Sequence, residues 1–517
     1  MFKPVILAVL DGWGIGRTEK GNPIAKANLP TIDKLNRYYP HAALQASGIS
    51  VGLPWEEMGN SEVGHMTLGA GKIIYQNMPR ITMDIQTGDF FKNKIFLEAL
   101  NNAKEKNSSL HLMGLIGKGA VHAYIDHFYA LLELSKEQKA EKVFLHLFTD
   151  GRDSPPDSGA SVIQELQGRL NRYGVGKIAT LCGRYFAMDR NNNWDRIEKA
   201  YNLLTRGEGN QAADPVQYLK DSYKKQVFDE YLEPGVIMEN GKPIATIQDG
   251  DSIIFFNFRE DRARQLTEAF ALPGFDKFNR EKMLDLDFVT MVQYEEGLPV
   301  NVAYDPIGVK NPLGSVLSKN NLSQLRIAET EKFAHVTYFF NGGSEEIPPR
   351  EDHVLIPSIV IDSFAKAPQM RAKEITDKLI ENIDKDKYDF ILVNYANADM
   401  VGHTGNEEAT QKAVEIIDEN LGKLITAVIL KKGCLLITAD HGNAEELKNT
   451  LTGEIDTEHS TNPVPVWFIT ADNHKDRSNE ELKVIGLLSD VAPTVLDLFN
   501  IKKPEEMTGE SLLPLLK

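Results

Sequence analysis

Ser61 stands in the segment Gly59-Asn60-Ser61-Glu62-Val63-Gly64-His65-Met66, where glycines and polar residues precede an apolar run. This pattern predicts an exposed hydroxyl at the start of a helix. A serine hydroxyl is a poor nucleophile unless its proton is removed or its alkoxide is stabilised. The Gly-x-Ser-x-Gly elbow that would supply an adjacent base is absent. Taken alone, Ser61 is read more simply as a helix N-cap.

A scattered set of carboxylates and imidazoles offers another way to activate Ser61, because a bound cation can hold a serine as its alkoxide. Asp399 and His403 are four residues apart and share one face of a helical turn. Mixed carboxylate and imidazole ligands suit Mn²⁺, Zn²⁺ or Co²⁺ better than Ca²⁺, and there are enough groups for two ions. Each residue alone could instead be a core histidine or a capping aspartate, and the spacings match neither a zinc finger nor a His-Glu-x-x-His protease. The set comprises Asp11, Asp399, His403, Asp440, His441 and His459.

Arginines recur between residues 120 and 265, and this region suggests a second kind of site. The guanidinium group matches carboxylate and phosphate in a bidentate way, so the set indicates a small, strongly anionic ligand. His122 and Asp153 are acid–base candidates for it. The alternatives are surface ion pairs, which Arg259-Glu260-Asp261-Arg262 makes possible by self-neutralisation, and a capping role for His122. The arginines are Arg152, Arg184, Arg190, Arg259 and Arg262, with Lys332 as a further cation.

Short apolar runs alternate with amphipathic stretches, which predicts an α/β chain with largely parallel sheets. The expected strands are Val5–Leu10, Leu110–Ile116, Val143–Phe148, Ile178–Cys182, Ile253–Asn257, Val336–Phe340, Phe390–Val393, Cys434–Thr438 and Val464–Ile469. The expected helices include Ser158–Asn171, Trp194–Thr205, Arg262–Phe270, Ile375–Ile383 and Glu408–Leu430. Six of the strands are followed by charged candidate residues. This placement is typical of sites at the carboxyl ends of parallel strands.

The candidate residues also sort by position, which predicts two domains. A chain of 517 residues exceeds one ordinary core. The metal-type residues lie before residue 70 and after residue 395, whereas the arginines lie between them. We therefore expect a discontinuous outer domain of residues 1–76 and 311–517, with residues 77–310 inserted as a substrate-binding domain.

Composition narrows the class of protein. Hydrophobic residues make up 42% and charged residues 25% of the chain, as in soluble globular proteins. The net charge of -17 argues against nucleic acid or an anionic membrane as partner. The two cysteines, Cys182 and Cys434, lie in apolar runs and are expected to be buried free thiols in a reducing compartment. Because the first apolar run is too short for a signal or a membrane span, we expect a cytoplasmic protein, and we expect a monomer.

Several segments, in one order along the whole chain, resemble the cofactor-independent (2,3-bisphosphoglycerate-independent) phosphoglycerate mutases. The first of them are Leu10-Asp11-Gly12-Trp13-Gly14, the Ser61 segment and Asp150-Gly151-Arg152-Asp153. The others begin at Gly183-Arg184-Tyr185, Asn257-Phe258-Arg259, Arg326-Ile327-Ala328, Ala398-Asp399-Met400 and Thr438-Ala439-Asp440. The resemblance implies an alkaline phosphatase-like outer domain with a mainly parallel sheet, an inserted α/β domain, and interconversion of 2- and 3-phosphoglycerate.

The resemblance also implies roles for individual residues. One Mn²⁺ would be held by Asp399, His403 and His459, and a second by Asp11, Ser61, Asp440 and His441, with Co²⁺, Zn²⁺ or Mg²⁺ as other possible ions. Ser61 would become a phosphoserine, with Asp153, His122 and Lys332 as further catalytic residues. The phosphoglycerate would be bound by His122, Arg152, Asp153, Arg184, Arg190, Arg259, Arg262 and Lys332.

Three positions depart from the family pattern, and other functions compete with a mutase. Glu260 stands where proline is common, and Asn341 and Ser344 stand where serine and a basic residue are frequent. A phosphatase, a sulfatase or a phosphopentomutase of the same superfamily is the nearest alternative, although no sulfatase motif with a modified Cys or Ser is found. A metal-binding module without catalysis would need neither Ser61 nor the arginines.

Overall fold

A computed structural model describes residues 2–280, 285–449, 452–478 and 480–516. It has mixed α/β structure with two mainly parallel sheets, which confirms the predicted fold class. The chain forms two compact units: unit 1 is Met1–Gln76 with Ile307–Lys517, and unit 2 is Asn77–Pro306. The chain returns from unit 2 to unit 1 after Pro306, whereas the boundary predicted from the sequence is residue 310. Each unit has its own buried core.

The sheet of unit 1 has the strand order β13-β12-β14-β1-β15-β16-β2-β17. Strands β12, β14, β1 and β15 are neighbours and run parallel. All six side chains of β1 are buried, as expected for a central strand covered on both faces. The strands are β1 (Val5–Leu10), β2 (His41–Gln45), β12 (Gln324–Glu329), β13 (Glu351–Ile356), β14 (Phe390–Tyr395), β15 (Cys434–Thr438), β16 (Val464–Ile469) and β17 (Val484–Leu487).

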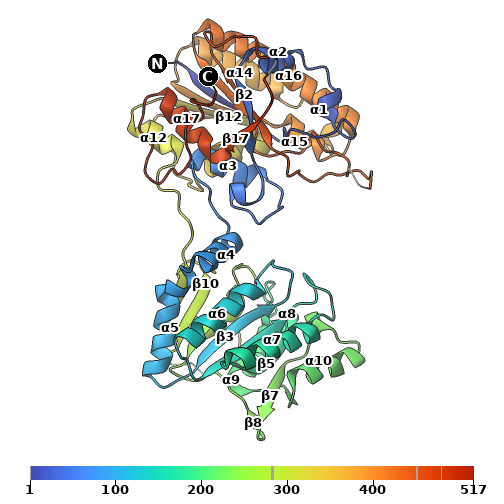
Figure 1. The fold of residues 1–517 in the computed structure, drawn as a ribbon, viewed down its shortest axis with the longest axis vertical. Coiled ribbons are helices and arrows are strands. Elements are labelled where there is room, and N and C mark those ends of the chain that lie inside the picture. The colour runs from blue at the N-terminus through green and yellow to red at the C-terminus, as the bar shows by residue number, and fades with distance from the viewer. Residues whose placement is uncertain (1, 281–284, 450–451, 479, 517) are drawn as a thin grey trace. The chain divides into compact units, whose positions relative to one another are not determined.

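Helices lie on both faces of this sheet (Figure 1). Helices α1 (Pro23–Lys26), α2 (Pro30–Tyr38), α14 (Ala372–Asp384) and α15 (Asn397–Gly402) pack on α16 (Glu407–Leu430). Helices α3 (Ser61–Ala70), α12 (Leu313–Lys319) and α17 (Val491–Leu498) pack on one another. Helix α13 (Thr330–Ala334) follows β12 directly.

The sheet of unit 2 has the order β11-β10-β9-β3-β4-β5-β7-β6, with β8 paired to β7. It is parallel from β11 to β5. The strands are β3 (Leu110–Ile116), β4 (Val143–Thr149), β5 (Lys177–Gly183), β6 (Asn210–Ala212), β7 (Gly235–Glu239), β8 (Lys242–Pro243), β9 (Ser252–Phe255), β10 (Asp287–Val292) and β11 (Asn301–Tyr304). The helices are α4 (Asn77–Thr87), α5 (Lys94–Glu105), α6 (Ile125–Glu137), α7 (Gly159–Tyr173), α8 (Arg184–Ala187), α9 (Trp194–Arg206), α10 (Pro215–Lys224) and α11 (Arg264–Ala271).

One predicted strand is wrong. Residues Val336–Phe340 lie in a π-helix, η4 (His335–Phe339), and in the residue that follows it. The run contains valine, threonine and aromatics, which favour strands, but its buried positions recur about every four residues, as on one face of a helix. The end of this helical segment packs directly against Gly69 of α3. Only glycine fits there, because a Cβ at residue 69 would lie 1.9 Å from the Phe340 carbonyl oxygen. Tertiary packing therefore overrides the local strand preference.

Two further expectations can be compared with the structure. Cys182 and Cys434 are both buried and free, as predicted, and burial raises the pKa of each thiol. Of the described helices, none is long and apolar enough to cross a lipid bilayer.

A buried ion pair joins β12 to β13 in unit 1. The Arg326 guanidinium is fully buried and donates to Glu351 Oε2 at 2.8 Å. Glu351 also accepts from Asn341 Nδ2 at 2.9 Å, so one of the departures from the family pattern supports this pair. Burial alone would raise the pKa of Glu351, but the charge of Arg326 and bonds from His353 and Asn341 lower it to about 2.

We predict that Glu351→Gln destabilises unit 1 by about 3–5 kcal/mol at neutral pH, because it leaves the charge of Arg326 buried without a counter-ion. The pKa of Glu351 lies below its ordinary 4.5, so its charge stabilises the fold above that pH. The stabilisation is lost as the pH falls toward 2. Urea unfolding of both proteins at several pH values measures this difference, which should shrink with acid. Glu381→Gln, at an exposed pair on α14, is the control and should leave stability nearly unchanged; equal effects of both changes would contradict the prediction.

Candidate functional site

Four neighbouring strand ends of unit 1 bring distant residues together. Because β12, β14, β1 and β15 are parallel, their carboxyl ends lie at one edge of the sheet. Each is followed by predicted site residues: Lys332 in α13, Asp399 in α15, Asp11 after β1, and Asp440 with His441 after β15. His459 comes from the loop before β16, and Ser61 begins α3.

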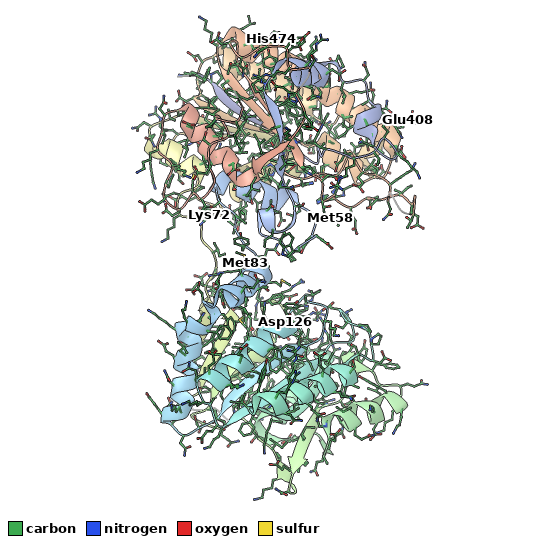
Figure 2. The ribbon with its side chains drawn as sticks, viewed as in Figure 1. Met58, Lys72, Met83, Asp126, Glu408 and His474 are labelled. Carbon is green, nitrogen blue, oxygen red and sulfur yellow. The ribbon has the colours of Figure 1, made fainter. Side chains whose placement is uncertain are left out.

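Ser61 is the first residue of α3, and the helix is capped by its neighbour. Asn60 Oδ1 accepts a hydrogen bond from the Val63 backbone N–H at 2.9 Å, so the N-cap reading of Ser61 is wrong. Gly64 allows α3 to lie against the end of β15, because a Cβ there would stand 2.6 Å from the Asp440 carbonyl oxygen. Figure 2 labels Met58, which lies in the loop just before this helix. The Ser61 side chain itself is left free to face the strand ends.

The Ser61 hydroxyl is surrounded by three charged or polar groups. Its Oγ lies 2.6 Å from Lys332 Nζ, 2.9 Å from His441 Nε2 and 3.1 Å from Asp11 Oδ1. Lys332 also donates to Asp11 Oδ1 and Asp399 Oδ2, each at 2.6 Å. Burial would lower the pKa of Lys332, but the neighbouring aspartates raise it, so the lysine stays charged.

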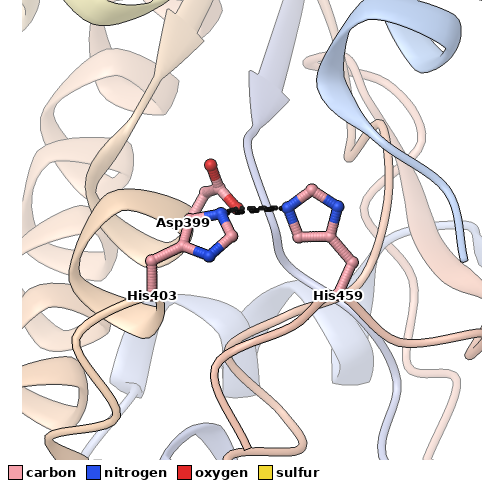
Figure 3. Close-up of side chains that lie close together, drawn as sticks. All are labelled: Asp399, His403 and His459. Carbon is pink, nitrogen blue, oxygen red and sulfur yellow. Dashed lines mark hydrogen bonds and ion pairs between the residues drawn. The ribbon is translucent and has the colours of Figure 1, made fainter. Parts of the chain in front are cut away.

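Asp399, His403 and His459 converge on one point (Figure 3). The Nε2 atoms of the two histidines lie 3.0 Å from each other and 3.3 and 3.4 Å from Asp399 Oδ1. Both Nδ1 atoms face backbone carbonyls, at 2.8 Å for His403 and 2.7 Å for His459, and so carry the hydrogens. Each Nε2 therefore directs a lone pair to the same place, which is an arrangement for a cation.

A second group, around Ser61, has the same character. His441 places Nδ1 3.3 Å from the Gly442 carbonyl oxygen and turns Nε2 toward Asp11. Asp11, Asp399 and Asp440 are all buried, and burial would lower the pKa of His441, but these carboxylates raise it to about 9. Among the described residues, no hydrogen-bond donor with suitable geometry reaches Asp440 Oδ2. The buried carboxylates and imidazoles thus suit divalent metal ions.

The sequence analysis did not single out every residue of this region. His65 and Asn394 are fully buried, and they contact Asp440 and Asp11 respectively. His65 could have been found by its spacing, since it follows Ser61 by one helical turn. Asn394 lies inside β14, and local sequence gives no signal for its contact with β1.

Unit 2 repeats the strand-end arrangement with a different chemistry. Strands β9, β3, β4 and β5 are parallel neighbours. The residues that follow them are His122 after β3, Arg152 and Asp153 after β4, Arg184 and Arg190 after β5, and Arg259 and Arg262 after β9.

Arg184 is the buried arginine of this group. Its Nη1 donates to Asp150 Oδ1 at 2.6 Å and to Asp153 Oδ2 at 2.5 Å. Asp150 is buried as well, and it also accepts from the Asp153 backbone N–H at 3.1 Å. Burial would lower the pKa of Arg184, but these two carboxylates raise it. Asp153 is therefore held in place by a charged partner.

The Asp261 carboxylate is surrounded by two of the arginines and by His122. Arg190 Nη1 donates to Asp261 Oδ2 at 2.7 Å, and Arg259 Nε lies 3.1 Å from Asp261 Oδ1. His122 Nδ1 is 3.6 Å from the same carboxylate and, within the described residues, has no hydrogen-bond partner. Burial and the charge of Arg184 lower the pKa of His122 to about 4, so its imidazole is neutral at neutral pH. The self-neutralisation considered for residues 259–262 is thus present at Arg259, and Arg190 joins the same carboxylate from outside that run.

The remaining predicted cations have separate surroundings. Arg262 Nη1 donates to the Met188 carbonyl oxygen at 3.2 Å, and burial and the charge of Arg184 lower its pKa. Arg152 is largely exposed and lies 3.6 Å from Glu230 Oε1. Lys332 belongs to unit 1 and contacts Ser61, so it is grouped with the carboxylates rather than with the arginines.

Comparisons with known proteins cover nearly the whole chain. The family described as BPG-independent PGAM N-terminus matches residues 81–296, and the family described as type I phosphodiesterase / nucleotide pyrophosphatase matches residues 313–483. The 2,3-bisphosphoglycerate-independent phosphoglycerate mutase of Clostridium perfringens (strain 13 / Type A) is 51% identical over 512 residues, 99% of each chain. The enzyme of the same name from Acetivibrio thermocellus is 50% identical over 513 residues, again 99% of each chain.

A solved structure agrees with these relatives. The crystal structure of Leishmania mexicana phosphoglycerate mutase at low cobalt concentration is similar with a TM-score of 0.54 and 30% sequence identity. The match covers 99% of this chain and 97% of that one. The resemblance seen in the sequence motifs is therefore confirmed over the full length. The chain belongs to the 2,3-bisphosphoglycerate-independent phosphoglycerate mutases.

Proposed function

We propose that this enzyme interconverts 2-phosphoglycerate and 3-phosphoglycerate, in glycolysis and gluconeogenesis, through a phosphoserine formed at Ser61. The observation that carries the proposal is the surroundings of the Ser61 Oγ atom, which touches Lys332, His441 and Asp11. A hydroxyl in contact with a buried ammonium group is easier to deprotonate, because the resulting alkoxide is paired at once.

Two divalent ions complete the proposed site, with Mn²⁺ as the first choice and Co²⁺, Zn²⁺ or Mg²⁺ as alternatives. Asp399, His403 and His459 would hold one ion, whereas Asp11, Ser61, Asp440 and His441 would hold the other. When bound, such ions supply positive charge that stabilises an alkoxide and the phosphoryl oxygens. The convergent Nε2 atoms support this assignment. So does Asp440 Oδ2, which accepts no hydrogen bond of good geometry within the described residues, although His65 Nδ1 lies 3.0 Å from it.

The residues of unit 1 then act on the phosphoryl group. Ser61 Oγ attacks phosphorus, the bond from phosphorus to the glycerate oxygen breaks, and Lys332 neutralises charge that builds up on the phosphoryl oxygens. The resulting phosphoserine would stand at the first residue of α3, where the helix dipole favours an anion. The second glycerate hydroxyl then attacks this phosphoserine and restores Ser61.

The residues of unit 2 would hold the glycerate and move its protons. The oxygen that leaves phosphorus must gain a proton, and the hydroxyl that attacks next must lose one. Asp153, oriented by Arg184, and the neutral His122 can serve in these transfers. Arg190, Arg259 and Arg262, with Arg152, offer guanidinium groups for the carboxylate and the phosphoryl oxygens. Retention of glycerate separates this reaction from simple hydrolysis, which a phosphatase would catalyse.

The first prediction from the proposed function concerns the nucleophile. Ser61→Ala should lower mutase turnover by at least about 10³-fold, because it removes the hydroxyl that would attack phosphorus. Conversion of 3-phosphoglycerate to 2-phosphoglycerate and release of inorganic phosphate are measured together. Ser135→Ala, at a buried helix serine of unit 2, is the matched control and should behave like the wild type. A phosphate label trapped at a residue other than 61 would refute the assignment.

The second prediction concerns the metal ions. A chelator should abolish activity, and Mn²⁺ should restore it, because the bound ions would neutralise the buried carboxylates and stabilise the Ser61 alkoxide. His459→Gln should lower the bound metal from two ions to one, as measured by elemental analysis, whereas His474→Gln should keep both. His474 is an exposed histidine that stacks on Tyr38 and serves as the control. Full activity in a protein stripped of metal would contradict the proposal.

The third prediction concerns the arginines. Arg259→Met should lower kcat/KM by about 10- to 150-fold, which corresponds to the loss of charged hydrogen bonds worth about 1.5–3 kcal/mol. Steady-state kinetics with 3-phosphoglycerate gives this ratio. Arg172→Met, at the exposed end of α7, removes the same kind of side chain and should have no effect. A normal kcat/KM for the Arg259 variant would exclude this residue from substrate binding.

A further inference from the structure

His65 and Asn394 form a buried hydrogen-bonded pair behind the carboxylates of unit 1. Asn394 Nδ2 lies 2.6 Å from Asp11 Oδ2 and 3.1 Å from His65 Nε2. His65 Nδ1 lies 2.9 Å from the Ser61 carbonyl oxygen and 3.0 Å from Asp440 Oδ2. Both side chains are fully buried. The pair therefore links the backbone of the proposed nucleophile to two of the proposed metal-binding aspartates.

The partners of His65 fix its tautomer. A carbonyl oxygen only accepts hydrogen bonds, so Nδ1, which faces the Ser61 carbonyl, carries the hydrogen. Nε2 then has the lone pair, and it accepts from the amide of Asn394. The two amide hydrogens of Asn394 are used by Asp11 and by His65. Although His65, Asp11 and Asp440 lie close enough to share a metal ion, the lone pair of His65 is already engaged.

The pair also fixes the orientation of the Asp11 carboxylate. Its Oδ2 is held by Asn394, so its Oδ1 faces Ser61 Oγ at 3.1 Å and Lys332 Nζ at 2.6 Å. Rotation of the carboxylate would break the bond to Asn394 and leave a buried amide hydrogen without an acceptor, which is costly. Asn394 thus holds the plane of the Asp11 carboxylate so that one oxygen faces the nucleophile.

Helix α3 connects this pair to the nucleophile itself. Ser61 and His65 are one turn apart on the same helix, and their hydrogen bond lies within that turn. The glycines Gly64 and Gly69 let this helix pack closely against Asp440 and Phe340. The imidazole is therefore placed by the same helix that carries Ser61.

We propose that His65 and Asn394 are positioning residues that set the orientation of Asp11, and with it the affinity of the cation site beside Ser61, without being metal ligands. This inference rests on the proposed roles of Asp11 and Ser61. It assigns a function to two residues of the reaction centre that touch neither substrate nor metal.

The test compares His65→Gln, His65→Leu, Asn394→Leu and the double leucine variant with the wild type. Leucine removes the hydrogen bonds; it is close in volume to histidine and keeps the branched shape of asparagine, whereas glutamine keeps an acceptor near the position of Nε2. Titration calorimetry with Mn²⁺ gives affinity and stoichiometry, and melting of the metal-free proteins reports folding. Asn420→Leu, at a buried asparagine of α16, is the matched control.

We expect each leucine variant to lose about 10- to 100-fold in affinity for one of two Mn²⁺ ions, while the stoichiometry stays at two. Turnover should fall with little change in KM. The double variant should be no weaker than the weaker single variant, because the pair acts as one unit. His65→Gln should recover part of the affinity, and Asn420→Leu should bind Mn²⁺ like the wild type.

Three results would overturn the inference. A stoichiometry of one in His65→Leu would make His65 a ligand, additive losses would make the two residues independent, and a lower melting temperature with unchanged Mn²⁺ affinity would leave them a purely structural role. Failure of the proposed function is a separate outcome: the wild type would then bind no Mn²⁺, or Ser61→Ala would keep its mutase activity.

Discussion

Three carboxylates buried side by side are the constraint on which the rest of unit 1 depends. Asp11, Asp399 and Asp440 are each at most 2% exposed, and charges removed from water are costly unless they are paired. Lys332 reaches two of them and His441 stands among all three. These two cations do not supply a donor to every carboxylate oxygen in the described part of the chain. Binding of divalent cations is the natural way for such a site to become stable.

The pairing of parallel strands explains how three aspartates so far apart in the sequence come to lie side by side. Asp11 follows β1 and Asp440 follows β15. These two strands are parallel neighbours whose first residues, Val5 and Cys434, are paired. Unit 2 uses the same device for Asp153, Arg184 and the residues after β9. The edge of a parallel sheet thus holds charged residues side by side, although they are far apart in the sequence.

The sequence predicted the parts of this arrangement that depend on local pattern. Apolar runs such as Val5–Leu10 identify strands, and the charged residues after them identify the edge where the sites lie. The run at Val336–Phe340 was misleading, because its strand-favouring residues pack as a π-helix against Gly69. Asn394 could not be found, since its contact with Asp11 follows from strand pairing and not from neighbouring residues. Local pattern therefore predicts elements and candidate residues, whereas partner choice is a property of the tertiary structure.

The arginines of unit 2 divide into two kinds, and the division bears on how an anion could bind. Arg184 is buried, and its charge is neutralised by ion pairs with Asp150 and Asp153. Arg190 and Arg259 are about half exposed and share Asp261. In the proposed function, a phosphate or carboxylate would compete with Asp261 for these guanidinium groups and gain bidentate contacts. These pairs would keep the two guanidinium groups in place until the anionic substrate binds, while the buried pair would keep Asp153 oriented.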